Sequence, residues 1–256
     1  MFLEPNRTPY DLRWRMFGTD VRVHPLFWLF SAVLGWREYS KPGGSVGYLA
    51  LWVGCVFVSV LLHEFGHIFM GRLFGADGHI VLYSFGGLAV GSNRLSRRWQ
   101  RMAVAFAGPA VQLLLWAALW LLAFRMGVLR RVPEAWLGPV LRAWAMLLAI
   151  NFFWPLLNLL PIWPLDGGQI SRDLLEGLLG ARGTSLALGV SLVVAGLLAI
   201  HCLMNEMDRQ FLPTWVPAGG VLGALLFGSL AAGSYMALQE ESQKRRHWDD
   251  DSPWGR

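Results

Sequence analysis

Two histidines and a glutamate in the first third of the chain have the spacing of a metal site. His63 and His67 are four residues apart, and Glu64 directly follows the first histidine. Positions i and i+4 lie on one face of a helix, so both imidazoles could bind one ion, as in many zinc sites. Glu64 lies beside the pair, where its carboxylate could act as a general base that takes a proton from water.

The setting of this motif is apolar. It lies within a run of mostly hydrophobic residues from Ser45 to Phe74. A charged side chain at membrane depth costs roughly 2.5 kcal/mol or more, so Glu64 needs a compensating partner, and a divalent cation would provide one. In the alternative interpretation, His63 and His67 are hydrogen-bonded core residues and Glu64 pairs with a neighbouring helix.

Asp166 is the best candidate for the third protein ligand that a catalytic zinc usually requires. It lies in the segment from Asn158 to Gly168, where two prolines and two glycines interrupt an apolar stretch. Non-helical backbone at membrane depth is tolerated where protein buries it or where it lines a wet cavity, so Asp166 should not face lipid. Asp166 could instead be the N-cap of a helix at residues 170–179. Glu176 could compete as ligand, although a solvated helix face explains it better.

The composition favours a membrane protein over soluble domains. Of 256 residues, 55% are hydrophobic and 15% are charged, and the mean hydropathy is +0.42. We expect an all-α polytopic membrane protein with about six transmembrane helices, in the apolar segments at residues 23–36, 46–74, 101–124, 136–160, 185–204 and 216–238. Residues 1–238 should form a single membrane-embedded domain with its catalytic core at about 46–170, and residues 239–256 a charged, disordered tail.

The basic residues predict that both termini lie in the cytoplasm. Most of them flank the expected cytoplasmic ends of the helices, whereas Arg125, Arg130 and Arg131 fall in an expected outer loop. In this topology the helix of His63 and the helix that ends near Asp166 both run toward the cytoplasm. His63 is about 24 Å from Gly47 along its helix at roughly 1.5 Å per residue, so both candidate ligand sets reach a similar depth nearer the cytoplasmic side. The pI of 9.7 reflects this topology and does not indicate nucleic acid as a partner.

The sequence His63-Glu-Phe-Gly-His67, combined with the Asn158–Gly168 segment, resembles the site-2 protease family of intramembrane zinc metalloproteases. The resemblance implies that one zinc ion is bound by His63, His67 and Asp166 and that Glu64 activates water. It also implies that Asn158 orients substrate or stabilises the oxyanion. The likeness extends over most of the first 170 residues, and it is weaker at Gln112, where members often carry asparagine.

Residues 79–90 alternate partly and end in glycines, which predicts a hairpin or a re-entrant loop. The family uses such a segment beside the active site to hold substrate. An exposed strand edge could pair with an unwound substrate, and Gly86 and Gly87 would allow close backbone approach, although each could also mark a simple turn.

The resemblance implies hydrolysis of peptide bonds in or next to the transmembrane segment of membrane-anchored substrates, which would be regulators or signal-peptide remnants. The expected location is a bacterial cytoplasmic membrane. Many members carry a PDZ or CBS domain, and no loop or tail here is long enough for one, so a membrane partner or prior trimming of the substrate should control cleavage. No oligomeric state is predicted. The competing interpretations are a catalytically silent scaffold, a zinc protease of the prenyl-protein kind and a metal transporter.

Overall fold

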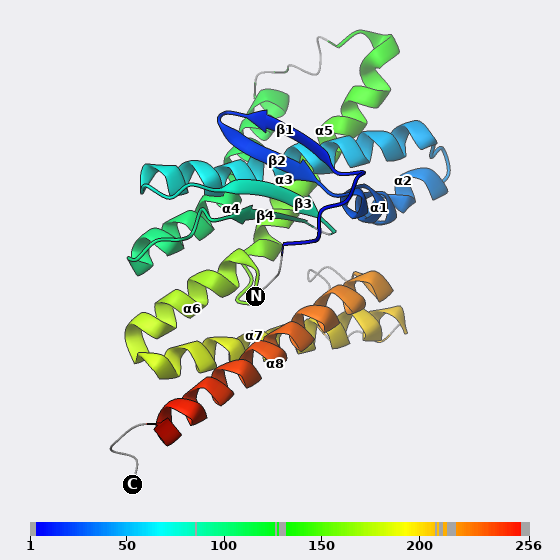
Figure 1. Ribbon diagram of the computed structural model, residues 1–256. Coiled ribbons are helices and arrows are strands. Elements are labelled where there is room, and N and C mark those ends of the chain that lie inside the picture. Colours follow the sequence, from blue (N-terminus) through cyan, green and yellow to red (C-terminus); the bar gives the residue numbers. More distant parts are fainter. Residues whose placement is uncertain are drawn as a thin grey trace. The chain divides into compact units, whose positions relative to one another are not determined.

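The computed structural model describes residues 4–84, 86–125, 127, 132–207, 209, 212–213 and 219–251, with side chains as far as residue 243. Residues up to Asn158 form one compact unit, and residues from Leu159 onward form another (Figure 1). The expectation of a single domain over residues 1–238 stays a prediction.

The first unit contains a four-stranded sheet in the order β1-β2-β3-β4. Its strands are β1 (Leu12–Met16), β2 (Thr19–Val23), β3 (His79–Tyr83) and β4 (Gly86–Val90). The pairs β1–β2 and β3–β4 are antiparallel, whereas β2 and β3 run parallel with Val21 opposite Ile80. A hairpin or re-entrant loop was expected at residues 79–90, whereas β1 and β2 were not predicted. Leu12, Trp14 and Met16 of β1 alternate with arginines, so a strand signal was present there and was not used.

A buried ion cluster fixes the N-terminal segment to this sheet. The Arg22 guanidinium donates to Asp11 at 3.1 Å and to Glu4 at 2.9 Å. Burial of the Asp11 carboxyl alone would raise its pKa, but hydrogen bonds from the Thr8 hydroxyl and amide and from Arg22 and Arg13 outweigh that effect. The pKa of Asp11 is therefore held well below its usual range, and the carboxyl stays ionised.

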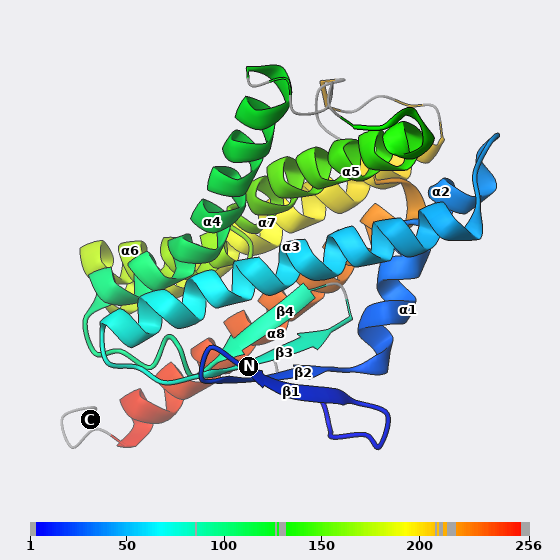
Figure 2. The same ribbon diagram turned by 90° about the horizontal axis from the view of Figure 1, so that it is seen from above.

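The same unit contains five helices: α1 (Pro25–Leu34), α2 (Trp36–Ser40), α3 (Val46–Leu73), α4 (Arg98–Phe124) and α5 (Glu134–Asn158). The side chain of His24 accepts a hydrogen bond from the Leu26 amide and so caps α1, and Ser45 caps α3 in the same way through the Tyr48 amide. The sheet packs along α3 (Figure 2). Buried side chains of β2, β3, α1 and α3 form the core there, including Val23, Phe27, Val60, Ile68 and Leu82.

The second unit consists of α6 (Asp166–Leu179), α7 (Ala181–Glu206) and α8 (Gly220–Asp251), with α7 and α8 packed side by side (Figure 1). The last helix differs from the expected apolar segment at 216–238, because it continues to Asp251. Residues 239–251 were expected to be disordered and are helical. Glutamine, glutamate, lysine and arginine are good helix formers, so this charged sequence can extend a helix that the apolar part has already started.

Five of the described helices are long and apolar enough to span a membrane: α3, α4, α5, α7 and the part of α8 from Gly220 to Gln243. These helices confirm the prediction of a helical, polytopic membrane protein. The expected first span at residues 23–36 instead forms α1, which has ten residues. A helix of that length is about 15 Å long, roughly half the thickness of the hydrocarbon core.

Candidate metal centre

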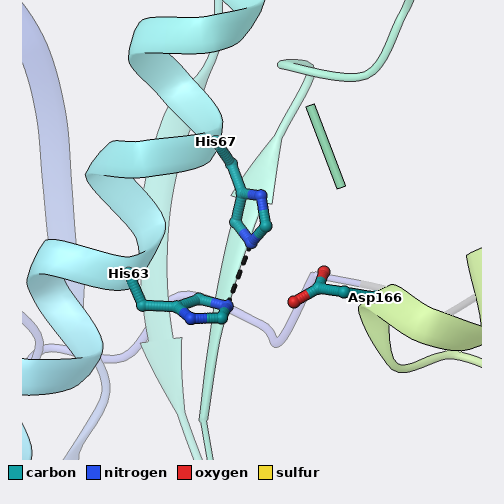
Figure 3. Close-up of side chains that lie close together, drawn as sticks. All are labelled: His63, His67 and Asp166. Carbon is teal, nitrogen blue, oxygen red and sulfur yellow. Dashed lines mark hydrogen bonds between the residues drawn. The ribbon is translucent and has the colours of Figure 1, made fainter. Parts of the chain in front are cut away.

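His63 and His67 project from one face of α3, and their rings turn toward one another (Figure 3). Their Nε2 atoms are 3.0 Å apart, and the ring planes meet at 81°. Both side chains are buried, and so is Glu64. The long apolar helix thus buries three titratable side chains within five residues of its sequence.

Hydrogen bonds at the Nδ1 atom of each imidazole ring determine the tautomers of His63 and His67. His63 Nδ1 lies 2.9 Å from Gln112 Oε1, and His67 Nδ1 lies 2.7 Å from the Val104 carbonyl oxygen. The Gln112 amide nitrogen Nε2 donates to the Ser59 carbonyl oxygen at 3.3 Å. Because a carbonyl oxygen can only accept, this contact fixes which end of the amide is the nitrogen and leaves Oε1 facing His63. Both contacts are therefore with oxygen acceptors, so both Nδ1 atoms carry the hydrogen.

The two Nε2 atoms then direct lone pairs at one another over 3.0 Å. Such an arrangement of neutral rings is repulsive unless a shared proton or a metal cation lies between them. Two zinc–nitrogen bonds of about 2.0–2.1 Å at a tetrahedral angle would hold nitrogen atoms about 3.3 Å apart. The pair fits such an ion with little movement. The interpretation as core histidines accounts for the Nδ1 contacts and requires a shared proton between the two Nε2 atoms.

Gly87 of β4 lies against the carboxyl group of Glu64. A Cβ atom at Gly87 would lie 2.5 Å from Glu64 Oε1, whereas a Cβ at Gly86 would meet nothing within 4 Å. The sequence analysis assigned both glycines to substrate contact. The structure distinguishes them, because only Gly87 has a close contact, and that contact is with the candidate base.

The backbone of α4 approaches the histidines equally closely. A Cβ at Gly108 would lie 2.4 Å from His67 Nε2 and 2.8 Å from His63 Nε2. Only a residue without a side chain lets α4 pack at this distance from α3. Gly108 was not among the site residues predicted from the sequence.

A buried polar network joins the histidine pair to α5. Asn151 donates to the Ser59 hydroxyl at 2.9 Å, and the carbonyl of Ser59 accepts from Gln112. The side chains of Ser59, Gln112 and Asn151 are completely buried. The sequence analysis did not assign these residues or Val104 to the site. An amide in an apolar helix was the available signal for Gln112 and Asn151, and a backbone carbonyl such as that of Val104 has none.

Asn158 is the last residue of α5 and is partly buried. Asp166 is the first residue of α6 and is buried (Figure 3). Leu165 holds the N-cap position of α6, and no side chain caps that helix. The alternative that Asp166 is an N-cap is therefore wrong. Asp173 is also buried, so the solvated face expected around Glu176 does not include it.

Comparisons with known proteins identify the class of protein that this chain resembles. The model of peptidase family M50 matches residues 126–200. Rip3 of Mycobacterium tuberculosis is 28% identical over 90% of this chain and 58% of its own length. The protein sll0528 of Synechocystis is 33% identical over 67% of this chain and 45% of its own length. Both names contain the words zinc metalloprotease. The chain thus spans about half the length of these relatives.

The fold has a counterpart among solved structures. The site-2 protease from Methanocaldococcus jannaschii matches with a TM-score of 0.56 at 21% identity, over 89% of this chain and 94% of that chain. At this level of identity the match establishes a common fold.

Proposed function

Because the chain belongs to the site-2 protease family of zinc metalloproteases, we propose that it is an intramembrane endopeptidase. Its reaction is the hydrolysis of a peptide bond in or next to the transmembrane segment of a membrane-anchored substrate. The observation that carries this proposal is the buried His63–His67 pair with facing Nε2 atoms and with Glu64 beside it. Burying two histidines and a glutamate in an apolar helix costs free energy, whereas a zinc-dependent hydrolase requires these side chains as ligands and base.

Zinc is the cofactor, and His63, His67 and Asp166 are the proposed ligands. Among the described residues, these three form the group of histidine, cysteine and carboxylate side chains that could hold a metal ion, each with one ligand atom. Three protein ligands leave one position open, as catalytic zinc sites require. When bound, zinc polarises the scissile carbonyl and makes water acidic enough to attack it.

Glu64 takes the proton from the attacking water and delivers it to the leaving amine. Asn158 is the proposed donor to the developing oxyanion or to the substrate backbone. Both roles follow from the family's motif.

The substrate segment must be extended where it is cut, because the hydrogen bonds of a helix shield its peptide groups. β4 offers a place for such a segment. It is the last strand of the sheet, and all five of its residues are partly exposed. A substrate strand paired with β4 would pass Gly87 and therefore Glu64. Gly86, which has open space around it, is the proposed point of close backbone approach.

The proposed setting is a bacterial cytoplasmic membrane. Both chain termini would lie in the cytoplasm, and the active site would lie nearer the cytoplasmic side of the membrane. Membrane-anchored regulators and signal-peptide remnants are the proposed substrates. A regulatory membrane partner would decide when they are cut.

Zinc content and cleavage together test this function. The purified chain is analysed for zinc in detergent and is incubated with a panel of single-span membrane peptides. The Glu64→Gln variant should keep about one zinc and lose cleavage, because it removes the base but no ligand. The Asp166→Ala variant should lose most of its zinc, because two histidines leave the coordination incomplete. Absence of zinc from the folded unmodified chain would contradict the proposed function, and cleavage by Glu64→Gln would contradict the role of the base.

A further inference from the structure

Two buried serines hold the backbone of the loop that precedes Asp166. Ser191 of α7 accepts a hydrogen bond from the Trp163 amide at 2.6 Å, and Ser234 of α8 lies 3.3 Å from the Trp163 carbonyl. The two hydroxyl oxygens are 2.6 Å apart. Both serine side chains are almost completely buried. Two helices that lie well beyond the motifs in the sequence thus meet at the backbone of Trp163, on its amide and on its carbonyl.

The donors and acceptors of this cluster close into a ring. The Trp163 amide donates to Ser191, the Ser191 hydroxyl can donate to Ser234, and the Ser234 hydroxyl faces the Trp163 carbonyl. The Ser234 hydrogen is shared with the Leu230 carbonyl at 2.9 Å. Each serine has one hydrogen, so this direction of donation satisfies all the groups at once. At membrane depth an unsatisfied amide or carbonyl costs several kcal/mol, which makes the ring a strong constraint on the loop.

The loop transmits that constraint to the first turn of α6. A Cβ at Gly168 would lie 2.4 Å from the Ile162 carbonyl and 2.6 Å from the Trp163 nitrogen, so the turn packs directly on the Ile162–Trp163 peptide group, whose amide donates to Ser191. The Leu165 amide donates to the Ile162 carbonyl at 2.8 Å. Ile162 itself is completely buried. Asp166 therefore follows a short, tightly packed connection that has little freedom of its own.

We propose that Ser191 and Ser234 are positioning residues for Asp166, so that the placement of α7 and α8 sets the placement of the third zinc ligand. This proposal rests on the proposed function, in which Asp166 binds zinc. Any displacement of α7 against α8, for instance when a substrate helix passes, would open the serine ring and weaken the metal site. The two helices would then control the site without contributing a ligand.

The test measures metal binding on the full chain in detergent. Zinc affinity is obtained by competition with a chelator, and the visible spectrum of the cobalt-substituted protein reports the ligand geometry. We expect Ser191→Ala and Ser234→Ala each to weaken zinc binding about tenfold, as loss of outer-sphere support commonly does, and to alter the cobalt spectrum. The double variant should lose less than the product of the two single effects, because the two hydroxyls contact one another and both hold the backbone of Trp163.

Matched variants separate positioning from simple stability. Ser229→Ala removes an exposed hydroxyl of α8 that bonds to its own helix, and it should leave the affinity and the spectrum unchanged. Ser234→Thr keeps the hydroxyl and should restore both. If an alanine variant does not fold, Ser191→Cys, which keeps the size and weakens the hydrogen bonds, takes its place and should show the same direction of change.

Two results would overturn the proposal in different ways. Unchanged zinc affinity and cobalt spectrum in both alanine variants, with only a lower melting temperature, would show that the serines merely stabilise the bundle. Unchanged zinc affinity in Asp166→Ala would instead remove Asp166 from the ligand set, and the positioning role would fall with it.

Discussion

Replacing Gly87 by alanine should disable the base without disturbing the metal site. The added Cβ would lie 2.5 Å from Glu64 Oε1 and from Glu64 Cγ, whereas an ordinary contact begins near 3.4 Å. The carboxyl end of a glutamate is flexible, so it can swing away by about 1 Å and the protein can still fold. A misplacement of that size at a reacting group costs on the order of a hundredfold in rate, equivalent to about 2.7 kcal/mol.

The assay is the single-turnover rate on a membrane peptide that the unmodified chain cleaves, with zinc content measured on the same preparation. Gly86→Ala is the comparison variant, because a Cβ there meets no protein atom within 4 Å and therefore tests the approach of substrate without displacing Glu64. We expect the Gly87 variant to retain its zinc and lose about a hundredfold in rate even at saturating substrate, and the Gly86 variant to lose rate only at low substrate concentration.

A Gly87→Ala variant that cleaves at the unmodified rate would refute the inference that the position of Glu64 limits the reaction. Equal losses in both variants would point to the strand edge itself, that is, to substrate pairing along β4, as the sensitive feature. Loss of zinc from the Gly87 variant would show that the strand supports the histidines as well.

Two further predictions concern the support of the site and of the sheet. Gln112→Leu removes the acceptor for His63 Nδ1 and should weaken zinc binding about 10- to 100-fold, measured by chelator competition; an unchanged affinity would mean that another group fixes the ring. Asp11→Asn should destabilise the protein at neutral pH. Because the folded pKa of Asp11 is lowered, its contribution is complete above the ordinary value of 3.8 and is lost as the pH falls below it. The difference in melting temperature between the unmodified protein and the Asp11→Asn variant should therefore shrink at low pH. A difference that stays constant with pH would contradict the stabilising role of the ionised carboxyl.

The long helices and the approach of His63 to His67 were predictable because each has a local signature. The spacing of His63 and His67 and the apolar composition around them are properties of one segment. The same holds for the apolar parts of all five long helices, although the charged end of α8 was not predicted. Asp166 was proposed because prolines and glycines interrupt the apolar segment around it, and the family motifs then implied the same residue.

What escaped prediction depends on contacts between distant segments. The carbonyl of Val104 and the amide of Asn151 acquire their roles only when α4 and α5 pack on α3. β1 is an exception, because Leu12, Trp14 and Met16 alternate with arginines and this local strand signal was not used. The length of α1 was overestimated because the apolar run at residues 23–36 is divided between the end of β2, a cap and a short helix.

The parallel pairing of β2 with β3 has a consequence for how the protein is made. The helices between these strands are α1, α2 and α3, the helix that carries His63 and His67. While the ribosome is still producing α3, the hairpin of β1 and β2 can already form, but the other edge of β2 has no partner. Only when β3 has been synthesised can Val21 and Val23 find their places beside Ile80 and Leu82. Translation proceeds at about 5–20 residues per second, so this edge is open for seconds. A nascent chain that stalls within α3 would present an unpaired, apolar strand edge to other proteins. Aggregation of the newly made protein is therefore most favoured in the period before β3 pairs with β2.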